Sequence, residues 1–166
     1  NSGRGNNGIL NGNANCNTVG RIGQGCSFDG NGDYIKTTND ADFKFDSDKD
    51  FSISAWFKPE SYGGWIFANK GINGVNCYVQ NNSVYRVSCN LKGNNSEASA
   101  VSATGSAGQL NVWYHMVLTA DRDGNAKVYL NGQTMSKSPN IAGIGSLTGT
   151  YSSNSNRNYF SIGAGN

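Results

Sequence analysis

The stretch FSISAWFK, residues 51–58, decides the fold of this chain. Its first, third, fifth and seventh residues are apolar, whereas the intervening ones are Ser, Ser, Trp and Lys. A period of two is that of a half-buried β-strand, and we interpret the stretch as a central strand of a sheet. Pro59 follows directly and has no N–H for a continuing ladder, so we expect the strand to end there.

Composition favours a single domain built from short strands and tight turns. The chain has 166 residues, of which 23 are Gly, 36% are hydrophobic and only 14% are charged. This length is enough to bury a core between two layers. The formal charge of +2 comes from scattered Lys and Arg, with no basic run that would neutralise a phosphate backbone. The sequence therefore argues against a nucleic-acid partner.

Nothing in the sequence predicts insertion into a membrane. No apolar stretch approaches the ~20 residues of a spanning helix. The opening segment NSGRGNNG has neither the charged nor the apolar region of a signal peptide, so we interpret the chain as a processed or excised piece.

The four cysteines predict two disulfides. They lack a C-x-x-C pair, and His115 is the only histidine, so a zinc site is not indicated. In CYVQNNSVYRVSC, a hairpin that turns at residues 82–84 places Cys77 opposite Cys89, which leaves Cys16 to pair with Cys26. Such bonds persist in oxidising surroundings and predict an extracellular or cell-surface location. Four free thiols in a cytosolic protein are the alternative.

The rest of the chain alternates between short strand patterns and turn residues. We expect residues 1–17 to form a loop pinned by Ile9 and Leu10, and the acidic loop over residues 39–50 to be tethered by Phe43 and Phe45. No long helical pattern occurs, so the predicted fold is all-β, an antiparallel sandwich or jelly roll. Further strands are expected near residues 26–28, 34–35, 65–68, 98–103, 112–120, 127–131 and 159–162.

Five motifs in order resemble the laminin-G-like jelly-roll domains of the concanavalin-A-like lectin/glucanase superfamily. They are SGRGNNGILNG (2–12), IGQGCSFDGNGDYI (22–35), DFSISAWFKP (50–59), WYHMVLTADRDGNAKVYLNG (113–132) and FSIGAG (160–165). The resemblance implies two stacked antiparallel sheets, secretion, recognition of glycans or surfaces, and a bound calcium ion in many members.

The sequence departs from the pattern of that family at both ends. The strand that precedes the first motif in the family, and the strand that follows the last, have no counterpart here. We therefore interpret residues 1–166 as one laminin-G-like domain that lacks the first and last strands of the family. Flanking chain or a neighbouring subunit would have to supply these strands, because an unpaired sheet edge is a liability.

Carboxylate clusters make calcium a possible structural cofactor. Asp29 and Asp33 flank a tight turn, and Asp46 and Asp48 alternate along the segment before the central strand. Carboxylates beside Gly and Asn carbonyls suit this hard cation, although no cluster completes a twelve-residue calcium loop. The alternative is that these Asp residues simply form turns at strand ends.

Four aromatic residues are candidates for a sugar-binding platform. Tyr62 and Trp65 flank a Gly-Gly turn. Trp56 alternates with the apolar residues of the strand expected at 51–58 and so faces away from the core, and Tyr129 lies on an outward face. Rings with a polar group stack well on sugar rings. The alternative is that they only cover a sheet face or fill loops.

Catalysis is not indicated. A retaining glycosidase needs two close carboxylates, but the only glutamates, Glu60 and Glu97, fall in loops, and His115 lies within an apolar strand. The sequence therefore predicts a non-catalytic extracellular module whose partner is a glycan or a cell-surface ligand. The first alternative is a structural or adhesive subunit of a surface filament or multidomain adhesin, with self-assembly or neighbouring domains. A polysaccharide-degrading enzyme is a weaker one.

Overall fold

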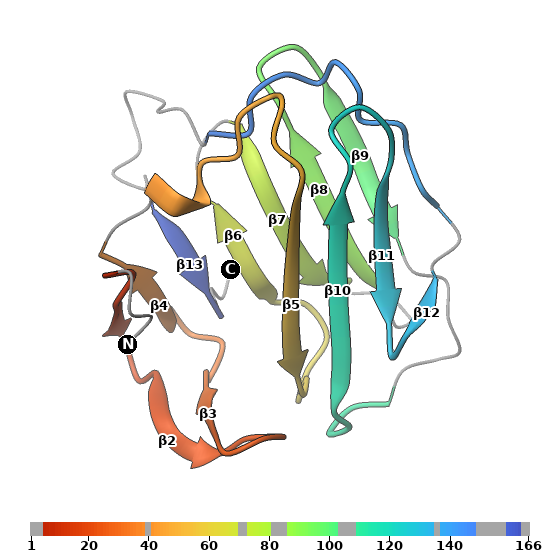
Figure 1. Ribbon diagram of the computed structural model, residues 1–166. Coiled ribbons are helices and arrows are strands. Elements are labelled where there is room, and N and C mark those ends of the chain that lie inside the picture. Colours follow the sequence, from red (N-terminus) through yellow and green to blue (C-terminus); the bar gives the residue numbers. More distant parts are fainter. Residues whose placement is uncertain are drawn as a thin grey trace.

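The protein is an antiparallel β-sandwich, as the sequence predicts (Figure 1). The computed structural model describes residues 5–38, 41–69, 73–80, 86–102, 109–134, 137–148 and 159–163, with the side chains of residues 99–102 left out. Within these ranges the only helical element is the 3₁₀ turn η1 (Ala41–Phe43). In the same ranges, no helix has the length and apolar character needed to cross a membrane.

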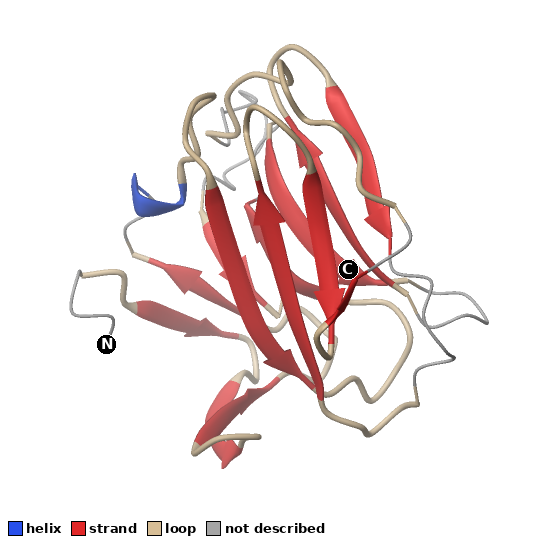
Figure 2. Ribbon diagram, turned by 45° about the vertical axis from the view of Figure 1, so that its right-hand side comes forward, coloured by secondary structure: helices blue, strands red, loops and turns tan. Residues whose placement is uncertain are grey.

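Two stacked sheets and one small hairpin contain all the described strands (Figures 1 and 2). The larger sheet has the order β1-β4-β13-β6-β7-β8-β9, the smaller has the order β12-β11-β10-β5, and β2 pairs with β3 alone. The strands are β1 (Gly8–Asn11), β2 (Asn15–Val19), β3 (Gln24–Ser27), β4 (Tyr34–Thr37), β5 (Phe51–Phe57), β6 (Trp65–Asn69), β7 (Gly74–Val79), β8 (Val87–Lys92), β9 (Glu97–Ser102), β10 (Tyr114–Ala120), β11 (Ala126–Leu130), β12 (Gln133–Thr134) and β13 (Phe160–Ile162).

The core lies between the two sheets and is built by the alternation of single strands. Every second residue of β10 is buried, and Met116 and Leu118 are fully so. Val75 and Leu91 meet them from the larger sheet. Burial of a side chain of this size contributes ~1.5–3 kcal/mol, so these few residues supply much of the driving force for stacking the sheets.

Both predicted disulfides are confirmed. Cys77 lies opposite Cys89 in the β7–β8 ladder, with both sulfur atoms in the core. Cys16 and Cys26 join β2 to β3 at the margin of the molecule. The turn predicted at residues 82–84 lies outside the described residues.

The expected aromatic tethers of the acidic loop are also confirmed. Phe43 stacks on Phe160 with ring centroids 4.2 Å apart, and Phe45 stacks on Phe51 at 3.9 Å. Each ring therefore fixes one end of the segment that leads into β5.

Two expectations about the sheets were wrong. Residues 51–57 form an edge strand and not a central one, because among the described strands β5 pairs with β10 alone. Residues 1–17 are not one loop, since they contain β1 and most of β2. Strand β1 forms through its backbone ladder with β4, which side-chain patterns do not reveal, and Ile9 and Leu10 stay about half exposed within it.

Candidate functional site

The outer face of the four-stranded sheet presents polar and aromatic side chains in cross-strand rows. The register pairs Ser54 with Val117 and Val117 with Tyr129, and it places Trp56 opposite His115. Directly paired residues of antiparallel strands project to the same side of a sheet. We call Ser54, Trp56, His115 and Tyr129, together with Arg21, which reaches them from a neighbouring hairpin, the outer aromatic face.

Trp56 is the most prominent ring on this face. Its side chain is 42% exposed and stacks on the imidazole of His115, with ring centroids 4.9 Å apart. His115 is held in turn, because Ser54 Oγ and His115 Nε2 share a hydrogen bond of 2.7 Å, and the backbone N–H of His115 donates to Asn131 Oδ1. The indole is thus held in place by its neighbours while it stays partly exposed, and a fixed, exposed ring can pack against the apolar face of a ligand.

Positive charge lies beside these rings. The Arg21 guanidinium lies 5.5 Å from the Trp56 ring centroid, and it comes from the turn between β2 and β3. The ammonium of Lys58 lies 5.8 Å from the ring centroid of Trp113, close to the end of β5. Such contacts leave the cations available to an anionic group on a ligand.

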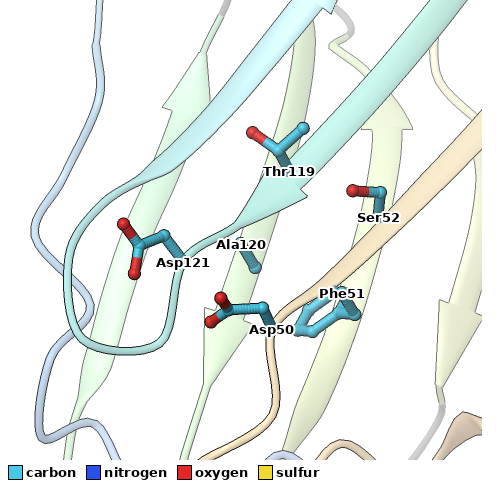
Figure 3. Close-up of a pocket in the computed structure, with 6 residues that line it drawn as sticks. All are labelled: Asp50, Phe51, Ser52, Thr119, Ala120 and Asp121. Carbon is cyan, nitrogen blue, oxygen red and sulfur yellow. The ribbon is translucent and has the colours of Figure 1, made fainter.

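A shallow hollow of about 420 Å³ lies on the same strand pair as the outer aromatic face, at its other end. Figure 3 shows Ser52 and Thr119 side by side on β5 and β10, with the carboxylates of Asp50 and Asp121 beyond them. Ser52 and Trp56 are four residues apart on β5, a separation of ~13 Å at ~3.3 Å per residue. Hydroxyl and carboxylate groups therefore lie at one end of this strand pair, and aromatic rings lie at the other.

A buried arginine fixes the rim of this hollow. The guanidinium of Arg122 is almost fully buried and donates through Nη2 to the carbonyl oxygen of Gly145, while its backbone N–H donates to Asp50 Oδ1 at 2.7 Å. Burial lowers the pKa of Arg122, and the charge of Asp50 partly opposes that shift. The carboxylate of Asp50 is therefore held in place at the start of β5.

The four predicted ligand residues do not form one platform. Trp56 and Tyr129 share the outer face of the smaller sheet. Trp65 lies on the opposite outer surface of the sandwich, where it contacts Tyr78 with ring centroids 4.9 Å apart. Tyr62 is about half exposed in the loop before β6.

The four predicted metal residues form two separate groups. Each carboxylate oxygen of Asp29 and Asp33 accepts a hydrogen bond, from the side chain and backbone of Asn13 and from the backbone N–H groups of Asn31 and Asp29 itself. The bonds from Asn13 and then Asn31 lower the pKa of Asp29. These donors point at the oxygen atoms that a cation would use, so the pair does not fit a calcium centre.

Asp46 and Asp48 lie in the exposed loop before β5, where Asp46 forms an ion pair of 3.9 Å with Lys49. No group of three His, Cys, Asp or Glu side chains with metal-binding geometry occurs in the described part of the chain. The calcium of the sequence analysis remains a prediction.

The residues weighed for catalysis do not assemble. Glu97 forms an ion pair of 3.8 Å with Lys92, and Glu60 lies exposed in the loop after β5. Ser54 and His115 do form a hydrogen-bonded pair, but they lie on an open sheet face, and no carboxylate among the described residues is recorded against the imidazole.

Comparison with known proteins places this architecture in a family. The sequence model of the concanavalin A-like lectin/glucanases superfamily, in its laminin-G form, matches residues 29–166. The chain therefore belongs to that superfamily, as its motifs predict.

Among curated proteins, botulinum neurotoxin type E of Clostridium butyricum is 30% identical over 112 residues, which cover 60% of this chain and 9% of the toxin. Among solved structures, the binding domain of botulinum neurotoxin serotype G has a TM-score of 0.73 at 18% identity and covers 96% of this chain and 42% of that one. The ligand-binding domain of serotype D in complex with N-acetylneuraminic acid has a TM-score of 0.72 at 17% identity, over 98% and 39% of the two chains. The chain spans less than half the length of each of these proteins.

Sequence reasoning did not find Arg21, His115 or Asp50 as parts of this surface. His115 carried a usable signal, because it has the same parity as Val117 and Thr119 and so faces away from the core. Arg21 carried none, since it reaches Trp56 only through the position of the β2–β3 hairpin.

Proposed function

We propose that this chain is a non-catalytic, extracellular recognition module that binds a glycan on the outer aromatic face. The observation that carries the proposal is the exposed Trp56 ring, which stacks on His115 and shares the strand pair β5–β10 with a hollow lined in part by hydroxyl and carboxylate groups. Rings recognise the apolar faces of sugars, and the polar groups recognise their hydroxyls.

The surroundings of the site support this proposal. Membership of a lectin-containing superfamily and the likeness to toxin binding domains, one of them in complex with N-acetylneuraminic acid, agree with glycan binding. Arg21 and Lys58 favour a glycan that carries a carboxylate over a neutral one. Two disulfides support a location outside the cytoplasm.

A glycan array, with and without calcium, tests the proposal. The protein should bind acidic glycans, and Trp56→Ala should weaken binding about fivefold, because a ring contact is worth ~1 kcal/mol and ~1.4 kcal/mol is a factor of ten. Arg21→Gln should weaken binding of acidic glycans more than of their neutral counterparts. Trp65→Ala is the matched control, since it removes an indole from the opposite surface.

Two results would contradict the proposal. One is that the protein binds to no glycan on the array. The other is a Trp65→Ala variant that loses affinity while Trp56→Ala keeps it, provided that both variants show the circular dichroism of the parent protein.

A further inference from the structure

The β2–β3 hairpin brings a positive charge to the outer aromatic face. It is inserted in the chain between β1 and β4, which are neighbours in the larger sheet, and residues 20–23 form its turn. This turn reaches toward the end of β5 in the smaller sheet, where the Arg21 guanidinium lies 5.5 Å from the ring centroid of Trp56 (Figure 1). The position of Arg21 therefore depends on how firmly the hairpin is held.

A buried carboxylate joins the two ends of the hairpin at its base. Asp33 is fully buried, and its two carboxylate oxygens accept hydrogen bonds from the backbone N–H of Asn13, at 2.5 Å, and of Asp29, at 2.6 Å. Asn13 precedes β2 and Asp29 follows β3, so one side chain links the chain that enters the hairpin to the chain that leaves it. These bonds also satisfy a carboxylate whose burial would otherwise be costly.

Two further links hold the strands of the hairpin together between its base and its turn. The disulfide joins Cys16 on β2 to Cys26 on β3. The hydroxyl of Thr18 donates a hydrogen bond of 2.9 Å to the carbonyl oxygen of Gly25. An isolated two-stranded hairpin is at best marginally stable in water, so the covalent link is the one that we expect to matter most for its shape.

We propose that this hairpin is the specificity-determining element of the outer aromatic face, with Asp33 and the Cys16–Cys26 disulfide as its positioning residues. They hold Arg21 beside Trp56, where the guanidinium pairs with the carboxylate of an acidic sugar whose apolar face packs on the indole. This inference rests on the proposed glycan-binding function, and it assigns the preference for acidic over neutral glycans to one element of the fold.

The position of Arg21 decides how much its charge contributes to binding. An exposed ion pair is worth little when a long side chain must first be ordered, because the entropy lost offsets the Coulomb attraction. Contact of the guanidinium with the indole orders the side chain before a ligand arrives. When the hairpin opens, the net charge of the protein stays the same, but Arg21 leaves the indole and the selectivity is lost.

NMR spectroscopy tests the positioning of Arg21 without any ligand. In the parent protein the side-chain protons of Arg21 should resonate upfield of ordinary arginine values, because the side chain lies over the indole of Trp56. This upfield shift should disappear in Trp56→Ala, which assigns it to that ring, and should largely disappear in Cys16→Ser/Cys26→Ser. Ile22→Thr is the matched control, since it changes an exposed neighbour of Arg21 in the same turn, leaves the links of the hairpin intact and should keep the shift.

Mild reduction of the folded parent protein produces the same open hairpin if the cysteine variant does not fold. Cys26 is exposed, whereas Cys77 and Cys89 are fully buried, so a phosphine reductant should cleave the hairpin disulfide first. Mass spectrometry of an alkylated aliquot shows which pair was cleaved. Reduction should remove the upfield shift of Arg21, and reoxidation should restore it.

Binding of sialyllactose and of lactose tests the specificity, because the two differ by one acidic sugar. The parent protein should bind sialyllactose more tightly. The ratio of the two affinities should fall about threefold in Cys16→Ser/Cys26→Ser, the size expected of one exposed ion pair. Arg21→Gln should lower the ratio by the same factor, and the combined variant should lower it no further, since both changes remove one contact. The affinity for lactose should stay that of the parent in all three variants.

Three results would overturn this inference. The first is an Arg21 shift that loss of the hairpin disulfide leaves unchanged, which would mean that other parts of the chain hold the hairpin. The second is an affinity ratio that falls in Arg21→Gln but not in Cys16→Ser/Cys26→Ser. The third is a parent protein that does not bind sialyllactose more tightly than lactose. None of these contradicts the proposed function, which fails only if the glycan array shows no binding or places it away from Trp56.

Discussion

The two disulfides should differ in their contribution to stability even though they close loops of similar size. The bonded cysteines are 12 residues apart in β7–β8 and 10 apart in β2–β3. On the chain-entropy account, loops of this size each contribute about 3 kcal/mol to the free energy of unfolding. Entropy of the unfolded chain alone therefore predicts no difference.

Burial makes the difference. Cys77 and Cys89 are fully buried in the core, so the double variant Cys77→Ala/Cys89→Ala also leaves small cavities that cost ~1 kcal/mol each, for a total of about 5 kcal/mol. Cys16 and Cys26 join a hairpin outside the two large sheets. That hairpin can open on its own, so Cys16→Ala/Cys26→Ala should cost at most about 3 kcal/mol.

Urea unfolding followed by tryptophan fluorescence measures both variants. With a slope of ~2 kcal/mol per molar urea, the midpoint should fall by ~2.5 M for the core pair and by no more than ~1.5 M for the hairpin pair. Equal shifts at unchanged slope, or a larger shift for the hairpin pair, would refute the argument from burial.

Three further changes have defined outcomes. Asp29 has a lowered pKa in the folded protein, so its contribution to stability is present above the ordinary pKa of 3.8 and is lost as the pH falls through the pKa of the folded state. Because the bond from Asn13 contributes most to this shift, Asn13→Ala should make the melting temperature fall less steeply below pH 4. Gly93→Ala would place a methyl group on the backbone carbonyl of Ile144 and should lower the free energy of unfolding by ~2 kcal/mol in urea, and an unchanged midpoint would show that the 141–147 loop yields easily. If calcium stabilises the fold, 1 mM calcium should raise the melting temperature of chelator-treated protein, and no change would remove calcium from the description.

Much of the sandwich follows from local patterns. Alternating apolar residues predicted β5, and the spacing of Cys77 and Cys89 predicted the register of β7 with β8, because these signals depend on neighbours a few residues apart. The insertion of β13 between β4 and β6 depends on pairing across more than ninety residues. A three-residue strand has too few positions to show such a partner in its sequence.

The candidate site was predictable only in part. Trp56 and Tyr129 lie on the polar parity of their strands, and the structure places both on one face. Trp65 is also an aromatic residue beside a turn, but its strand belongs to the larger sheet. Only the assignment of strands to sheets shows that it does not share a face with Trp56 and Tyr129. The edge position of β5 was missed for the same reason, since an alternating strand looks alike at an edge and in the centre of a sheet.

Strand β5 carries Trp56 on its outer side, and among the described strands it pairs with β10 alone. A glycan held against the indole needs this strand in place, so glycan binding and local opening of β5 are linked equilibria. A glycan at about 100 times its dissociation constant should therefore raise the free energy of that local opening by ~2.7 kcal/mol.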